Sequence, residues 1–201
     1  MINQDLREHA INIAVKLRMG ENVDCQEYTA LIDELVSAGR LWRKTHQVDL
    51  KTAQTLASLY PSMYGAAALY EEDENEVEAA AYKILKTMIH ETSEQHDSEI
   101  YDTFLTDYDI RIKTVLDETI MDIKSKKHQG VSLERLTNEI RLASRYWKKA
   151  GFINPYILCK LISVYPFLVH KYVCDTKFTE IFHTESVERL QDHIEIALEA
   201  N

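Results

Sequence analysis

Two segments of this chain match each other closely: residues 31–61 read LIDELVSAGRLWRKTHQVDLKTAQTLASLYP, and residues 136–166 read LTNEIRLASRYWKKAGFINPYILCKLISVYP. They align without a gap at an offset of 105, and ten of the 31 positions are identical. Chance at average composition would give about two identities. The identical pairs are Leu31/Leu136, Glu34/Glu139, Ala38/Ala143, Arg40/Arg145, Trp42/Trp147, Lys44/Lys149, Leu56/Leu161, Ser58/Ser163, Tyr60/Tyr165 and Pro61/Pro166. This self-similarity predicts a tandem internal duplication of a helical unit of roughly 100 residues.

Each matching segment is expected to contain two helices. Apolar residues recur at helical spacing, as in Leu31, Leu35 and Trp42 of the first copy. Asp49 and Asn154 are both good N-cap residues, so a helix should start at the same place in both copies. The proline that ends each segment should break or kink that helix.

The flanking sequence extends the same helical pattern. Helices are expected at about 4–19 and 75–95 around the first segment, and at about 98–127 and 179–199 around the second. Asp24 followed by Glu27 predicts a capping box at the start of the helix that holds Trp42. Alternating strand-like runs are absent. We therefore expect an all-α fold of two helical bundles, residues 1–97 and 98–201, packed as a pseudo-two-fold pair.

Composition and charge narrow the classes of function. The chain has 201 residues, 23 basic and 33 acidic side chains, and a net charge of -10, so it lacks the general basic character of many nucleic-acid-binding proteins. The start of the sequence has no basic region followed by an apolar one, and the most apolar stretch, residues 161–169, is too short to cross a bilayer. These observations predict a cytoplasmic protein without a membrane partner.

Two basic motifs occupy equivalent places in the repeat: RLWRK at residues 40–44 and RYWKK at residues 145–149. On a helix, Arg40 and Lys44 each lie about 160° from Trp42, on opposite sides, so the two cations point together away from it. We expect both tryptophans in the core and both cation pairs on the surface, where they complement the C-terminal end of the helix dipole. The candidate partner-binding cations are Arg40, Arg43, Lys44, Arg145, Lys148 and Lys149.

The negative charge is concentrated in one part of the chain. Residues 71–109 contain thirteen acidic and two basic side chains, and the densest run begins with Glu71, Glu72, Asp73 and Glu74. This run is either a solvated helix start, favoured by the dipole, or a docking surface for a basic partner. The second copy has no equivalent run.

One cluster has the residue types of a metal site. His90 and Glu94 are spaced to share an ion on one helix face. The His96–Asp97 dipeptide resembles the motif of the HD-class metal-dependent phosphohydrolases, which are also all-helical and need further His and Asp ligands. The resemblance implies a metal-dependent hydrolase centred on His90–Asp102. Glycine-rich phosphate loops and the HExxH motif are absent, and we expect no cofactor.

The pattern as a whole favours binding over catalysis. We expect a non-enzymatic protein, such as an adaptor, an assembly factor or an inhibitor (including a virus-encoded one), that presents two similar helical surfaces to a protein partner. The first alternative is nucleic-acid binding through the twin Arg-x-Trp-x-Lys motifs. The second alternative is the metal-dependent hydrolase.

Overall fold

The chain folds into α-helices joined by a very short β-ladder. The computed structural model describes residues 3–22, 24–67, 69–70, 74–93, 105–124, 133–174 and 184–200. These residues form α1 (Gln4–Arg18), α2 (Cys25–Thr45), β1 (Val48–Asp49), α3 (Leu50–Ala67), α4 (Glu74–Ser93), α6 (Asp107–Lys124), α7 (Leu133–Ala150), β2 (Phe152–Ile153), α8 (Pro155–Cys174) and α10 (Thr184–Leu198). The all-α prediction is confirmed.

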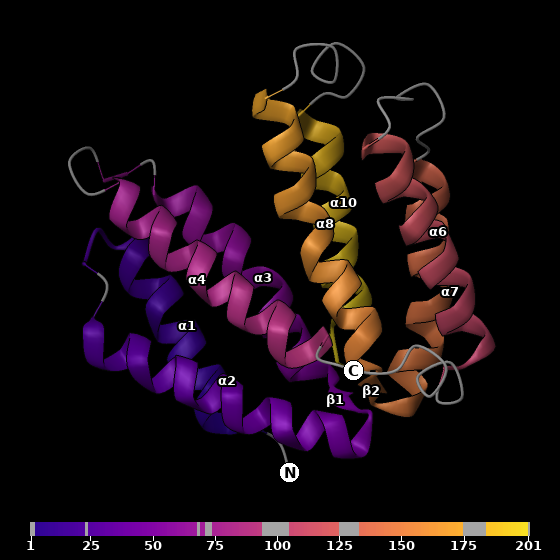
Figure 1. Ribbon diagram of the computed structural model, residues 1–201, viewed down its shortest axis with the longest axis horizontal. Helices are drawn as coiled ribbons and strands as arrows, with labels where there is room; N and C mark the ends of the chain where they lie inside the picture. The colour runs from indigo at the N-terminus through magenta and orange to yellow at the C-terminus, as the bar shows by residue number, and fades with distance from the viewer. Residues whose placement is uncertain are drawn as a thin grey trace.

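The helices are arranged in two groups, which lie on either side of the ladder in Figure 1. In the first group α1 and α4 each pack against both α2 and α3. In the second group α6 and α10 each pack against both α7 and α8. Between the groups, α3 packs against α8 and α10, while α4 packs against α8.

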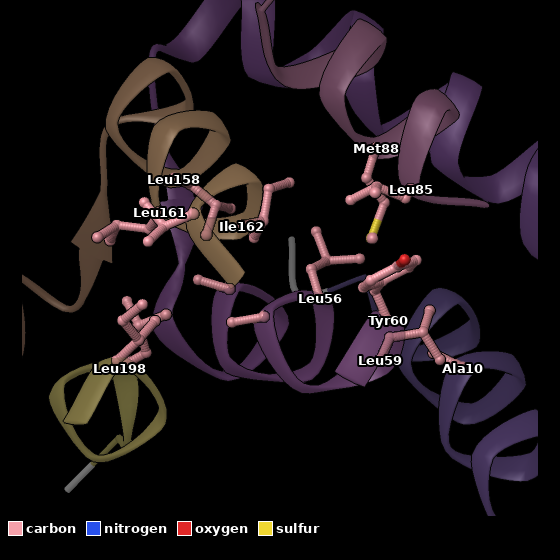
Figure 2. Packing of buried hydrophobic residues seen from close by; sticks show 14 of the residues in the cluster. Ala10, Leu56, Leu59, Tyr60, Leu85, Met88, Leu158, Leu161, Ile162 and Leu198 are labelled. Carbon is pink, nitrogen blue, oxygen red and sulfur yellow. The ribbon is translucent and has the colours of Figure 1, made fainter. Parts of the chain in front are cut away.

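Helix α3 lies at the centre of the hydrophobic core. Its neighbours α1, α4, α8 and α10 surround it, and their apolar side chains point toward it in Figure 2. Leu56 lies between the side chains of α8 and those of α4. Its solvent exposure is 0%. Residues from both halves of the chain therefore share one core, because each amphipathic helix has to bury its apolar stripe against another element.

Three helix starts predicted from the sequence are confirmed. The Asp24 carboxylate accepts hydrogen bonds from the backbone N–H groups of residues 26 and 27, at 2.8 and 3.4 Å. Asp49 Oδ1 accepts from Thr52 N at 3.0 Å, and Asn154 Oδ1 accepts from Tyr156 N at 2.9 Å. These side chains satisfy backbone donors that the first helical turn leaves without a partner.

The predicted capping box at the start of α2 forms only in part. Glu27 does not reach back to the backbone of Asp24, because its carboxylate accepts hydrogen bonds from three side chains of α1. Asn12, Lys16 and His9 lie 2.9, 3.1 and 3.2 Å from its oxygens. Glu27 therefore connects two helices.

The ladder was not predicted from the sequence. β1 and β2 pair antiparallel, with Val48 opposite Ile153 and Asp49 opposite Phe152. Two residues are too few to produce a period-two pattern, so only the pairing itself reveals them. The ladder joins the chain just after α2 to the chain just after α7.

Of the two outcomes expected at Pro61 and Pro166, a break or a kink, the break does not occur, because α3 continues to residue 67 and α8 to residue 174. A proline inside a helix removes the N–H group that would bond the carbonyl four residues earlier. At Pro61 that carbonyl belongs to Ala57, and Gln191 Nε2 of α10 donates a buried hydrogen bond to it at 3.0 Å. The other group of helices thus supplies the missing donor.

Within the described residues, no helix combines the length and the apolarity that a bilayer crossing requires.

Candidate functional site

The last turn of α2 holds the first basic motif. Trp42 is buried, with an exposed fraction of 2%, while Arg40 and Lys44 are exposed. Neither cation makes a hydrogen bond or ion pair with another side chain in the described part of the protein. The helix ends at His46, whose left-handed backbone (φ 53°) lets its N–H donate to Trp42 O at 2.8 Å. The sequence-based placement of these three side chains is correct.

The last turn of α7 repeats this arrangement. Trp147 is buried, and Arg145 and Lys149 are exposed. Gly151, at φ 79°, donates its N–H to Trp147 O at 2.7 Å, as His46 does to Trp42 O. Both helix ends adjoin the β1–β2 ladder (Figure 1). The two cation pairs therefore occupy equivalent helix positions, at the ends where the two groups of helices meet.

Arg43, a third candidate cation on α2, is engaged inside the fold. Its Nη1 lies 2.9 Å from Oε2 of Glu91, and the Glu91 side chain is only 5% exposed. Gly39 makes room for this carboxylate, because a Cβ on that residue would lie 2.1 Å from Oε2. Lys148, the equivalent residue on α7, is half-buried. The sequence carries no signal for the Arg43–Glu91 pair, because the two residues lie 48 positions apart.

A polar cavity of about 190 Å³ lies between the two helix ends. Residues 45–47, at the end of α2 and just after it, line one side, and Asp109, Trp147 and Asn154 line the other. Asp109 is 3% exposed, and its Oδ1 accepts a hydrogen bond from Trp147 Nε1 at 3.1 Å. Its Oδ2 accepts from the backbone N–H and the hydroxyl of Thr106, at 3.1 and 2.8 Å. All of these polar contacts are internal, so this carboxylate holds the start of α6 against α7.

Most of the predicted acidic site lies outside the described residues. Glu71, Glu72 and Asp73 precede α4, and only the backbone of Glu74, the first residue of α4, is described. Near this helix start, a cavity of about 440 Å³ lies between α2 and α4. It is lined in part by Tyr28 and by the exposed Cys25.

The predicted metal cluster also lies largely outside the described residues, since Glu94 and residues 96–102 are among those left out. His90 is exposed, and its Nδ1 lies 3.2 Å from Oε1 of Glu91. Glu91 is already paired with Arg43 through its other oxygen. In the described ranges, no group of three or more His, Cys, Asp and Glu side chains is placed to hold a metal ion.

Comparison with known proteins does not assign a function to these residues. The chain matches no protein-family model, no curated protein and no solved structure.

Proposed function

We propose that this chain is a non-enzymatic protein-binding protein, built from two copies of one helical unit, that presents similar basic surfaces to an acidic protein partner. The two units are residues 1–97 and 98–201. The observation that carries the proposal is the repeated helix end: Arg40 with Lys44, and Arg145 with Lys149, each exposed beside a buried tryptophan.

The order of the elements supports the duplication. Among the elements that the structure describes, each half has two helices, then a two-residue strand and then two more helices. The four helix pairs that are in contact in the first half correspond to the four in the second. Contacts between the halves are also reciprocal, because α4 packs against α8 in the same way that α10, its counterpart, packs against α3.

Individual positions support the duplication as well. Nine of the ten identical pairs have the same degree of burial in both halves, and the exception is the half-buried Tyr165 against the buried Tyr60. Val48 and Ile153 are equivalent at the offset of 105, and they lie opposite each other in the ladder. An antiparallel pair of equivalent residues is what a pseudo-two-fold axis through the ladder would produce.

The charge distribution supports a binding role for the cation pairs. The chain as a whole has a net charge of -10, so exposed cations that make no ion pair with the described residues are locally distinctive. Two such pairs on one chain permit bivalent binding, in which the second contact benefits from a high effective concentration. The buried faces of Trp42 and Trp147 leave no ring at these positions for a nucleic-acid base to stack on.

The experiment compares variants in capture of partners from the native cell extract. The variants are Arg40→Gln with Lys44→Gln, Arg145→Gln with Lys149→Gln, and the combination of all four. We expect the wild type to retain one protein after nuclease treatment, each double variant to retain less, and the quadruple variant to lose it. The melting temperature should stay nearly constant, because all four side chains are exposed.

A charge-matched control separates this site from a general charge effect. Lys51, Lys83, Lys86 and Arg141 are exposed cations elsewhere on the surface, and changing all four to Gln should preserve capture. Equal capture by the first quadruple variant would overturn the proposal. Recovery of nucleic acid that is lost on nuclease treatment and falls steeply with salt would favour the alternative function instead.

A further inference from the structure

A groove of about 520 Å³ lies between α1 and α10, on the side of the molecule away from α4. In Figure 2, Ala10 of α1 and Leu198 of α10 mark the helices on either side of α3. Pro61 of α3 and Tyr165 of α8 line the groove between them. Both groups of helices therefore contribute to this surface.

The α1 wall of the groove is apolar. Ile11 and Val15 line it, and they are 52% and 47% exposed. They are four residues apart, so they lie on one helix face, and Met19, which is 70% exposed, continues this stripe by one more turn. The buried face of α1 lies elsewhere, since it is formed by residues such as Leu6 and Ile13. Exposed apolar side chains that line a groove can be covered by the apolar face of a partner.

The α10 wall of the groove is acidic. Glu188, Asp192 and Glu195 all line it, and their spacing of four and three residues places them on one helix face. None of the three forms an ion pair within the described residues. Arg18 is the one cation among the described lining residues, and it donates to Ser62 Oγ at 3.0 Å. The groove therefore has an excess of negative charge along one side.

The negative charge of the groove affects the pKa of Tyr165. Its pKa is raised above the usual value of 10, first by burial and then by the negative charge of Glu188, with Tyr64 and Glu195 adding to the effect. The neutral phenol is thus favoured in the groove. A positive group placed at the same point would be attracted by the same two carboxylates.

We propose that this groove binds a basic amphipathic helix of a partner protein. The apolar face of that helix would cover Ile11 and Val15, and its Lys or Arg side chains would pair with Glu188, Asp192 and Glu195. The seven residue steps from Glu188 to Glu195 span about 10 Å, so cations one turn apart on the partner match the three carboxylates. This surface is separate from the Arg40 and Arg145 helix ends, and it requires a partner of the opposite charge.

The test uses a defined probe. It is a fluorescein-labelled, stapled peptide of about fifteen residues, long enough for four helical turns, with Leu along one face and Lys beside it. Fluorescence anisotropy measures its affinity for the full chain. We expect the probe to bind at least tenfold more tightly than a peptide with Glu in place of Lys, or than a scrambled peptide. Weak binding of all three peptides would overturn the proposal.

Two groove variants test the two walls separately. Glu188→Gln, Asp192→Asn and Glu195→Gln together should weaken binding at least tenfold and reduce its dependence on salt. Ile11→Ser with Val15→Ser should weaken binding as much but leave the salt dependence intact. All five side chains are at least partly exposed, so the melting temperature should change little.

Matched controls show whether binding of the probe depends on this groove in particular. Asp33→Asn, Glu76→Gln and Glu134→Gln remove three exposed acids elsewhere and should leave the affinity unchanged. The quadruple variant of Arg40, Lys44, Arg145 and Lys149 should also bind the probe normally, which separates this result from the proposed function. Equal loss in the control triple variant would overturn the proposal. So would self-association of the wild type that the Ile11 and Val15 changes abolish, because a second copy would then be the occupant.

Discussion

Within the described residues, the two halves of the molecule each bury one acidic side chain, but they hold it in different ways. In the first half Glu91 of α4 pairs with Arg43 of α2, and Gly39 provides the space. In the second half Asp109 of α6 accepts a hydrogen bond from Trp147 of α7. The equivalents of Gly39 and Arg43 are Ser144 and Lys148, for which the structure describes no such pair.

This difference distinguishes the sequence positions that the two halves share from the polar contacts that occur in only one half. The repeated positions are mostly apolar or basic, and their burial is the same in both halves except at Tyr60 and Tyr165. The buried acids are not repeated, because a buried charge depends on a specific partner and geometry that a neighbouring helix has to supply. The core pattern can therefore be shared while the polar contacts between helices differ.

The largest expected effect comes from breaking the Arg43–Glu91 pair. Arg43→Ala leaves a buried carboxylate without its guanidinium, and we expect the free energy of unfolding to fall by about 3–5 kcal/mol. Lys148→Ala at the equivalent position should cost less than about 0.5 kcal/mol. Urea denaturation measures both changes. Similar losses for the two variants would show that the halves do not differ here.

A second variant tests the space that Gly39 provides. In Gly39→Ala the new Cβ would lie 2.7 Å from the Glu91 Cβ, so α4 has to move away from α2. We expect a loss of about 1–3 kcal/mol, as for overpacking in a core. Ser144→Ala should lower stability by less than that, because Ser144 already has a Cβ. Thermal unfolding measures the stability of both variants. A Gly39→Ala variant as stable as the wild type would contradict this prediction.

The two internal prolines allow a double-mutant cycle. Gln191→Ala removes the donor to Ala57 O, and we expect a loss of about 1–3 kcal/mol for an unsatisfied buried carbonyl. In a Pro61→Ala background the helix supplies its own N–H, so the loss should shrink by about 1 kcal/mol. A Pro166→Ala background is the control and should leave the cost of Gln191→Ala unchanged. If the cost of Gln191→Ala changed in both proline backgrounds, or in neither, the assignment of this hydrogen bond would be contradicted.

The contribution to stability of the hydrogen bonds between α1 and Glu27 of α2 should decrease at low pH. Hydrogen bonds from Asn12, Lys16 and His9 lower the pKa of Glu27 from 4.5 to about 2. Because the folded-state pKa lies below the unfolded value, this contribution to stability is complete above pH 4.5 and is lost as the pH falls toward 2. Glu27→Gln should flatten the dependence of stability on pH in this window. In the second half, α6 and α7 are joined by ion pairs with exposed arginines, Arg111–Glu139 and Arg135–Glu118, and Glu139→Gln should have the smaller effect.

The smallest expected effect concerns the residues that end α2 and α7. Gly151→Ala places a side chain at φ 79° and should cost about 1 kcal/mol, although no neighbouring atom lies within 4 Å of the new Cβ. His46→Gly at the equivalent position should raise stability by roughly 0.5 kcal/mol. Opposite shifts in melting temperature would confirm the shared helix ending, and shifts of the same sign would contradict it.

Local patterns in the sequence predicted the fold class and most helix positions correctly. Trp42 and Trp147 were placed in the core from helical phase alone, and the caps at Asp49 and Asn154 followed from residue type. The exposure of the Arg40 and Arg145 pairs followed from the same geometry. Periodicity and capping are local properties, so neighbouring residues are enough to reveal them.

The features that were missed all depend on residues far apart in the chain. Helix α3 continues through Pro61, and Gln191, 134 residues away, bonds the carbonyl that the proline leaves without a donor. Arg43 pairs with Glu91, a contact that the sequence did not indicate. The β-ladder and the groove between α1 and α10 likewise require both halves to be in place. These contacts exist because packing the helices around α3 brings distant polar groups together, and no local pattern specifies which groups will meet.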